Sequence, residues 1–178
     1  MNVIGAYVTH GPDAGRLDDR SWVVLPQSRA KKPRTTPQER AAAHGLTVEE
    51  GGPIDAERLV AFLWQVAGRP ADAAPTWRRA RPVVIALDTD SVHTGPAIRA
   101  AQPPLAAANV ALVYRARYCP AQSGIAPVWN DVKQHQIPVR SFAPVAALKR
   151  AVDDALARKA PQLQRAPTKP TNVHRLAA

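Results

Sequence analysis

The stretch Pro82-Val83-Val84-Ile85-Ala86-Leu87-Asp88 decides the fold that this sequence predicts. Its apolar residues run without alternation, which favours a strand covered on both faces at the centre of a mixed sheet. An Ala-rich helical stretch follows over 95–108, which Pro103-Pro104 should break into two pieces, and a second strand follows over 110–114. This order predicts a parallel βαβ crossover with Asp88 at the carboxyl end of its strand, where α/β folds are open to ligands.

The rest of the chain predicts a hairpin and three more helices. Strands over 3–9 and 21–25, separated by the turn Gly11–Gly15, indicate an antiparallel hairpin. A helix over 55–67 has Asp55 as its N-cap and Gly68 as its stop. Two further helices are predicted over 125–136 and 141–159. Their expected buried residues are Leu59, Phe62, Leu63 and Val66 in the first helix, Val128, Trp129 and Val132 in the second, and Val145, Leu148, Val152 and Leu156 in the third.

Composition limits the class of protein. The 178 residues carry a formal net charge of +10, which favours an anionic partner such as nucleic acid, although a bias toward Arg would give the same charge. The single cysteine, Cys119, excludes an intrachain disulfide and a multi-cysteine metal site. No stretch has the pattern of a signal peptide or a membrane span, so we expect a cytoplasmic protein, associated with the nucleoid if it binds DNA.

Three segments are predicted to lie outside the packed core. Residues 27–52 indicate an exposed basic insertion, which is either a solvated loop or an arm that contacts DNA phosphates. Residues 69–81 indicate a linker rich in Pro, Ala and Arg, and 160–178 a disordered basic tail. The folded domain is therefore predicted over 1–159. The candidate DNA-binding residues are Arg29, Lys31, Lys32 and Arg34.

Two motifs downstream of the hairpin resemble one family. Asp88-Thr89-Asp90-Ser91-Val92-His93 follows the apolar strand, and Tyr118-Cys119-Pro120 leads to Pro127-Val128-Trp129-Asn130-Asp131-Val132-Lys133. With Arg99 and Tyr114 between them, these motifs occur in the order found in the mariner-like DDE transposases. The resemblance covers roughly residues 2–157, apart from the basic insertion and the linker.

The resemblance implies an α/β fold of the ribonuclease-H-like type, a mixed five-stranded sheet flanked by helices, here without its N-terminal strand. Enzymes of this family cut and join DNA with two Mg²⁺ or Mn²⁺ ions held by three carboxylates. The implied partner is DNA, together with a second copy of the chain or an intact transposase.

Only one of the three carboxylates is present, which makes Asp88 the one candidate catalytic and metal-binding residue. Ala126, 38 residues further on, stands where the resemblance implies the last carboxylate. Asn130 is a poor ligand for a hard cation, Asp131 should point elsewhere on the helix, and Asp90 would reach the site only through a folded-back loop. We therefore expect this chain not to cleave DNA. The alternatives are a non-catalytic DNA-binding or regulatory protein that partners an intact transposase, or a product without a partner.

The sequence also gives expectations for His93, the tryptophans and Cys119. His93 is either a structural hydrogen-bonding residue at the end of the sheet or a partner to a phosphate or metal. Trp129 is expected in the core. Trp22, Trp64 and Trp77 are not clustered in sequence with the basic runs, so the sequence predicts no aromatic surface for stacking single strands. Cys119 has no recognisable base nearby in sequence and is expected to be inert.

Overall fold

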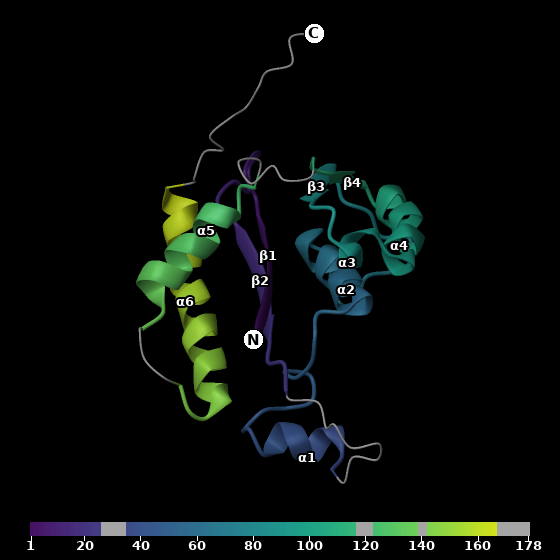
Figure 1. Cartoon of the computed structure of the whole chain (residues 1–178). Coiled ribbons are helices and arrows are strands. Elements are labelled where there is room, and N and C mark those ends of the chain that lie inside the picture. Colours follow the sequence, from purple (N-terminus) through teal and green to yellow (C-terminus); the bar gives the residue numbers. More distant parts are fainter. Residues whose placement is uncertain (26–34, 117–122, 139–141, 167–178) are drawn as a thin grey trace. The chain divides into compact units, whose positions relative to one another are not determined.

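The structure is a computed structural model that describes residues 1–25, 35–116, 123–138 and 142–166 (Figure 1). These residues form a mixed α/β protein with two small sheets and six α-helices. The chain divides into two compact units, which are described separately. Unit 1 contains the described residues within 1–54 and 124–170, and unit 2 those within 55–123. The single domain over 1–159 stays a prediction.

Unit 1 begins with the predicted antiparallel hairpin. Strand β1 (Asn2–Tyr7) pairs with β2 (Leu17–Trp22) in a register that places Asn2 opposite Trp22 and Tyr7 opposite Leu17. The predicted second strand, 21–25, was placed too late. The start of β2 was not predicted because it contains three charged residues in succession, Asp18-Asp19-Arg20, which lack the apolar pattern typical of strands.

Helices cover the hairpin and form the core of unit 1 with it. Helix α5 (Ala126–Asp131) continues into the π-helix η2 (Val132–Gln136), and the long helix α6 (Val145–Arg165) follows. Gly5 of β1 lets the Trp129 ring approach, since a Cβ there would lie 2.5 Å from Trp129 Cζ2. The expected packing of helix 125–136 is confirmed. The buried residues of this cluster are Leu17, Val128, Val132, Val152, Ala155, Leu156 and Leu163.

Helix α6 corrects the predicted tail. It ends at Arg165, six residues beyond the predicted end, so residues 160–165 are helical, and 167–178 lie outside the described residues. Leu163 is 3% exposed, and its carbonyl lies against the hairpin turn at Gly15, whose φ is +94°. Burial of Leu163 offsets the free-energy cost of Pro161 inside the helix. The helix predicted over 141–159 ends before this proline.

Part of the predicted basic insertion is folded in unit 1. Helix α1 (Pro37–Ala42) has a capping box, in which the Thr36 hydroxyl accepts from the Glu39 amide and the Glu39 carboxylate accepts from the Thr36 amide. Ala41 and Leu46 are buried against Val23 and Ala146. Most described residues within 36–52 are exposed, as expected of an insertion, but the buried Ala41 and Leu46 anchor the segment to unit 1.

Unit 2 contains the predicted parallel crossover. Strand β3 (Val83–Leu87) leads through α3 (Ser91–Thr94) and α4 (Pro96–Ala107) to β4 (Val110–Tyr114), and the strands are parallel with Leu87 opposite Tyr114. Helix α4 is continuous through Pro103 and Pro104, contrary to the predicted break. Because the two prolines have no amide hydrogen, the carbonyls of Arg99 and Ala100 lose their usual helical donors. Both residues are exposed, so water can donate hydrogen bonds to these carbonyls instead.

Helix α2 (Ala56–Val66) packs against α4 in unit 2 and has the predicted caps. The Asp55 side chain accepts from the Arg58 amide at 2.8 Å, and Gly68 ends the helix with φ +74°. The four predicted core residues of α2 are at most 4% exposed, which confirms the prediction.

The sheets differ from the predicted five-stranded sheet. In the described residues, β1 pairs with β2 and β3 with β4, in two separate two-stranded sheets. Strand β3 buries Ile85 and Leu87 on one face, but Val84 is 63% exposed on the other, and Val113 of β4, opposite Ala86, is 44% exposed. The expectation of a central strand covered on both faces is therefore wrong for the sheet seen here.

Candidate functional site

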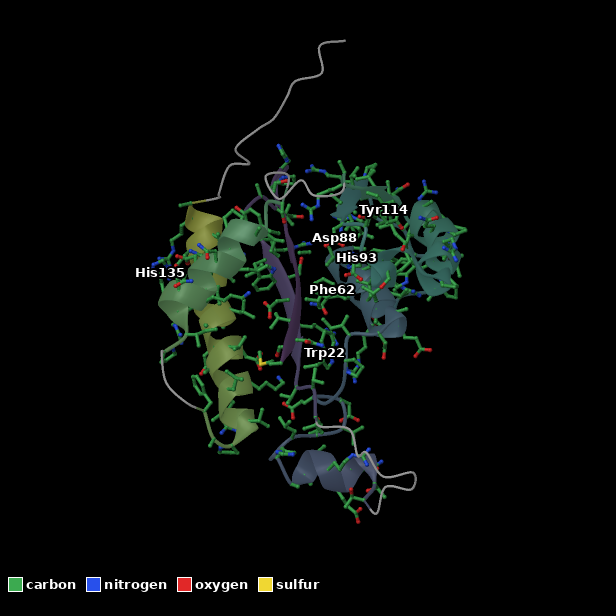
Figure 2. The ribbon with its side chains drawn as sticks, viewed as in Figure 1. Trp22, Phe62, Asp88, His93, Tyr114 and His135 are labelled. Atoms are coloured by element: carbon green, nitrogen blue, oxygen red, sulfur yellow. The ribbon has the colours of Figure 1, made fainter. Side chains whose placement is uncertain are left out.

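The candidate site lies in unit 2 at the carboxyl ends of the two parallel strands. Asp88 follows β3, and His93 belongs to the short helix α3 (Figure 2). Arg115 follows β4. His93 Nδ1 lies 2.5 Å from Asp88 Oδ1, and Arg115 Nη2 lies 4.0 Å from Asp88 Oδ2. The crossover thus brings the predicted catalytic carboxylate together with two basic side chains.

Hydrogen bonds fix the connection between β3 and α3. The Asp90 amide donates to Asp88 Oδ1 at 3.0 Å, and Asp90 caps α3 by accepting from the Val92 amide at 3.1 Å. The Tyr114 hydroxyl donates to the His93 carbonyl at 3.0 Å. Asp90 therefore serves as a helix cap, as Asp often does at this position, and His93 is held by Asp88 through its ring and by Tyr114 through its carbonyl.

The charges of this cluster compensate one another. Burial opposes ionisation of Asp88, but the Asp90 amide, His93 and Arg115 together outweigh it and lower the pKa of the Asp88 carboxyl below its usual value. About half of the Asp88 side chain is exposed, whereas those of His93 and Arg115 are 18% and 21% exposed. The donors around Asp88 thus favour the ionised form of its carboxylate.

The donor set does not fit the Mg²⁺ or Mn²⁺ that the resemblance implies. Both oxygens of Asp88 face protein cations or donors, and a metal ion there would compete with His93 and experience repulsion from Arg115. Among the residues that the structure describes, no three His, Cys, Asp or Glu side chains are placed to hold a metal ion. Hard divalent cations need several oxygen ligands, which this cluster does not supply.

The other positions weighed for the metal site belong to unit 1. Ala126 is the first residue of α5, and Asn130 lies one turn later. Asp131 is engaged within unit 1, with Lys159 Nζ at 2.7 Å and His135 Nδ1 at 3.0 Å. Because Asp88 lies in unit 2, the predicted pocket shared by Asp88 and Ala126 stays a prediction.

The predicted DNA-binding residues Arg29, Lys31, Lys32 and Arg34, and also Cys119, lie outside the described residues. Their expected roles stay predictions.

A cluster that the sequence did not predict occurs at the end of α2. Trp64 of α2 and Trp77 of the segment 69–81 meet edge to face, with ring centroids 6.5 Å apart and an interplanar angle of 69°. The guanidinium carbon of Arg69 lies 4.8 Å from the centroid of the Trp64 ring. The signal was weak in the sequence because Trp64 and Trp77 are thirteen residues apart. We call Trp64, Arg69 and Trp77 the Trp–Arg cluster.

Unit 1 has an open pocket of about 370 Å³ between the start of β1 and helices α5, η2 and α6. Trp129, Val132 and Leu148 make its wall largely apolar, and Lys133 supplies the one charged side chain among the lining residues described. It contains no carboxylate side chain, so it has no donors for the predicted metal chemistry.

Comparison with protein-family models, curated proteins and solved structures found no match to this chain. A separate search for apolar helices in the described residues found none that is long enough to span a membrane.

Proposed function

We propose that this chain is a transposase-derived DDE endonuclease domain, of ribonuclease-H-like type, that has lost its catalytic centre and retains affinity for DNA. The observation that carries the proposal is the parallel crossover with Asp88 at the carboxyl end of β3, followed by a helix that begins at Ala126. This arrangement agrees with the order of motifs by which the sequence resembles the mariner-like transposases. The net charge of +10 supports a polyanionic partner.

The proposed loss of catalysis rests on two positions, Asp88 in unit 2 and Ala126 in unit 1. Asp88 is balanced by His93 and Arg115, and alanine at position 126 offers no oxygen to a metal ion. Metal-assisted cleavage of a phosphodiester depends on charge neutralisation by two ions held between several carboxylates. A single carboxylate whose oxygens already contact His93 and Arg115 does not provide that environment.

A plasmid-nicking assay in Mn²⁺ tests the catalytic part of this proposal. We expect no nicking by the unchanged chain, and none by Ala126→Glu, because one added carboxylate does not complete the set. Metal-dependent nicking by the unchanged chain that Asp88→Asn abolishes would overturn the assignment.

The second candidate is a DNA-binding regulatory protein that partners an intact transposase. The basic residues of the chain favour it, because electrostatic contact with phosphates needs no catalytic centre. A gel shift at low salt tests the DNA affinity common to both candidates, and we expect binding that falls steeply as salt rises. If no complex forms at low salt, neither candidate retains its DNA-binding role.

A further inference from the structure

We infer that the Trp–Arg cluster and the exposed arginines beside it form a binding site for single-stranded DNA in unit 2. The inference rests on the proposed DNA-binding function and names a site for it. The ligand would stack an unpaired base on the Trp77 indole and place its phosphates against Arg78 and Arg81. Aromatic rings beside basic side chains are the common way in which proteins bind single strands without sequence preference.

The first observation is the concentration of positive charge. Residues 69–81 contain four arginines, at 69, 78, 79 and 81, against one acid, Asp72. Arg78 and Arg81 are exposed. A strand of phosphates passing this segment would therefore meet an excess of positive charge with little internal neutralisation.

The second observation is that the segment is anchored. The Arg79 guanidinium donates to the Ala67 carbonyl at the end of α2, and the Arg79 amide donates to the Ala108 carbonyl at 3.1 Å. The Asn109 side chain donates to the Arg79 carbonyl at 2.7 Å. Arg79 is thus used for anchoring, which fixes the backbone of the segment, and the nearby Arg78 and Arg81 are exposed to solvent.

The third observation concerns the two indoles. Arg69 covers one face of Trp64, whereas Trp77 meets Trp64 edge to face, and both tryptophans are only partly buried. The edge-to-face contact orients the two rings, and the Trp77 side chain remains partly exposed. A partly exposed, oriented ring beside arginines can receive a base at a small cost in side-chain entropy.

Fluorescence anisotropy with labelled oligo-dT and with a duplex of the same length tests this site in the full chain. We expect Trp77→Ala to weaken oligo-dT binding by about tenfold, within the range for removal of one stacked base, with little effect on the salt dependence. Trp77→Phe should retain most of the affinity. Arg78→Gln/Arg81→Gln should weaken binding and reduce the salt slope by about 0.7 for each phosphate that is no longer neutralised.

Arg150→Gln, an exposed residue of α6, is the matched control for removal of one charge, and Lys31→Gln/Lys32→Gln tests the predicted basic arm. If the arm variant loses binding while Arg78→Gln/Arg81→Gln and Trp77→Ala behave like the control, the inference fails and the proposed function stands. If the unchanged chain binds no DNA at low salt, both fail. If Trp77→Ala melts like the unchanged chain and binds oligo-dT equally well, stacking is excluded.

Discussion

Unit 1 and unit 2 each contain a two-stranded sheet, but they stabilise it differently. In unit 1 the antiparallel hairpin packs on α5, η2 and α6. In unit 2 the parallel pair β3–β4 buries one face against its helices and leaves Val84 and Val113 exposed on the other. Antiparallel sheets often have one solvated face, whereas parallel sheets are usually covered on both. The comparison teaches that the two units bury their sheets in different ways, unit 1 with helices of its C-terminal segment and unit 2 with helices α2 and α4 on one face.

The largest expected effect comes from the core of unit 1. Leu156→Ala should lower the free energy of unfolding by about 2–5 kcal/mol, because Leu156 is 1% exposed and its removal leaves a cavity. Val84→Ala, on the exposed face of unit 2, should change it by less than about 0.5 kcal/mol. Urea denaturation measures both. Similar losses for the two variants would show that Val84 is covered, and the contrast between the sheets would disappear.

The turn of the hairpin gives a second, smaller effect. Gly15→Ala should cost about 1–3 kcal/mol, because φ is +94° and the new Cβ would lie 2.5 Å from the Leu163 carbonyl oxygen. Gly11→Ala is a matched control, since φ is +86° and nothing lies within 4 Å of the added carbon. The difference between the thermal melts of the two variants gives the part of the stability loss that comes from packing of the turn on α6. Equal losses would mean that the turn does not depend on this helix.

Acid titration should separate Asp19 of unit 1 from Asp88 of unit 2 by the sign of their effects on stability. Burial, and then the charges of Asp153 and Asp18, raise the pKa of Asp19 in unit 1, whereas the pKa of Asp88 in unit 2 is lowered. An ionised Asp19 disfavours folding, so Asp19→Asn should stabilise the protein near neutral pH. That gain should shrink as pH falls through the raised pKa and vanish below the unfolded value.

Asp88→Asn should have the opposite effect. An ionised Asp88 favours folding, so the variant should be less stable near neutral pH, and the difference should shrink as pH falls through the lowered pKa of the native carboxyl. Unfolding free energies from urea titrations between acid and neutral pH measure both variants. The same sign for the two at neutral pH would contradict the described environments of these carboxylates.

The ion pairs should give the smallest effect. Lys159 Nζ lies 2.7 Å from Asp131 in unit 1, and Arg115 Nη2 lies 4.0 Å from Asp88 in unit 2. We expect Lys159→Gln to cost more than Arg115→Gln, with both losses below about 1 kcal/mol because these carboxylates are partly solvated. Denaturation at low and high salt checks the order, and salt should reduce both losses. A larger loss for Arg115→Gln would place the stronger pair in unit 2.

Much of the local structure could be predicted from sequence because short-range patterns determine it. Helix α2 has a complete set of local signals, from the Asp55 cap to Gly68, and its four predicted core residues are buried. The parallel crossover followed from the order of two apolar strands and an Ala-rich helix. The start of β2 could not be predicted in the same way, because contacts with β1 and α6 hold its charged residues in a strand.

The site was predictable in part. The apolar run before Asp88 placed this carboxylate at the end of β3, but its partners depend on tertiary structure. Arg115 is 27 residues away in sequence and reaches Asp88 only through the pairing of β3 with β4. The Trp–Arg cluster was missed for the same reason, since it joins a helix to a segment that the sequence predicted as a linker.

The composition of β1 has a practical consequence. Asn2–Tyr7 contains no charged residue and no proline, and in the described chain it pairs with β2 alone. Charge and proline are the usual features that keep edge strands from joining strands of other molecules. Mutual repulsion between copies that each carry +10 opposes such joining, and electrolyte screens that repulsion. High salt concentrations, such as those used to remove nucleic acid during purification, should therefore also promote aggregation of the purified chain.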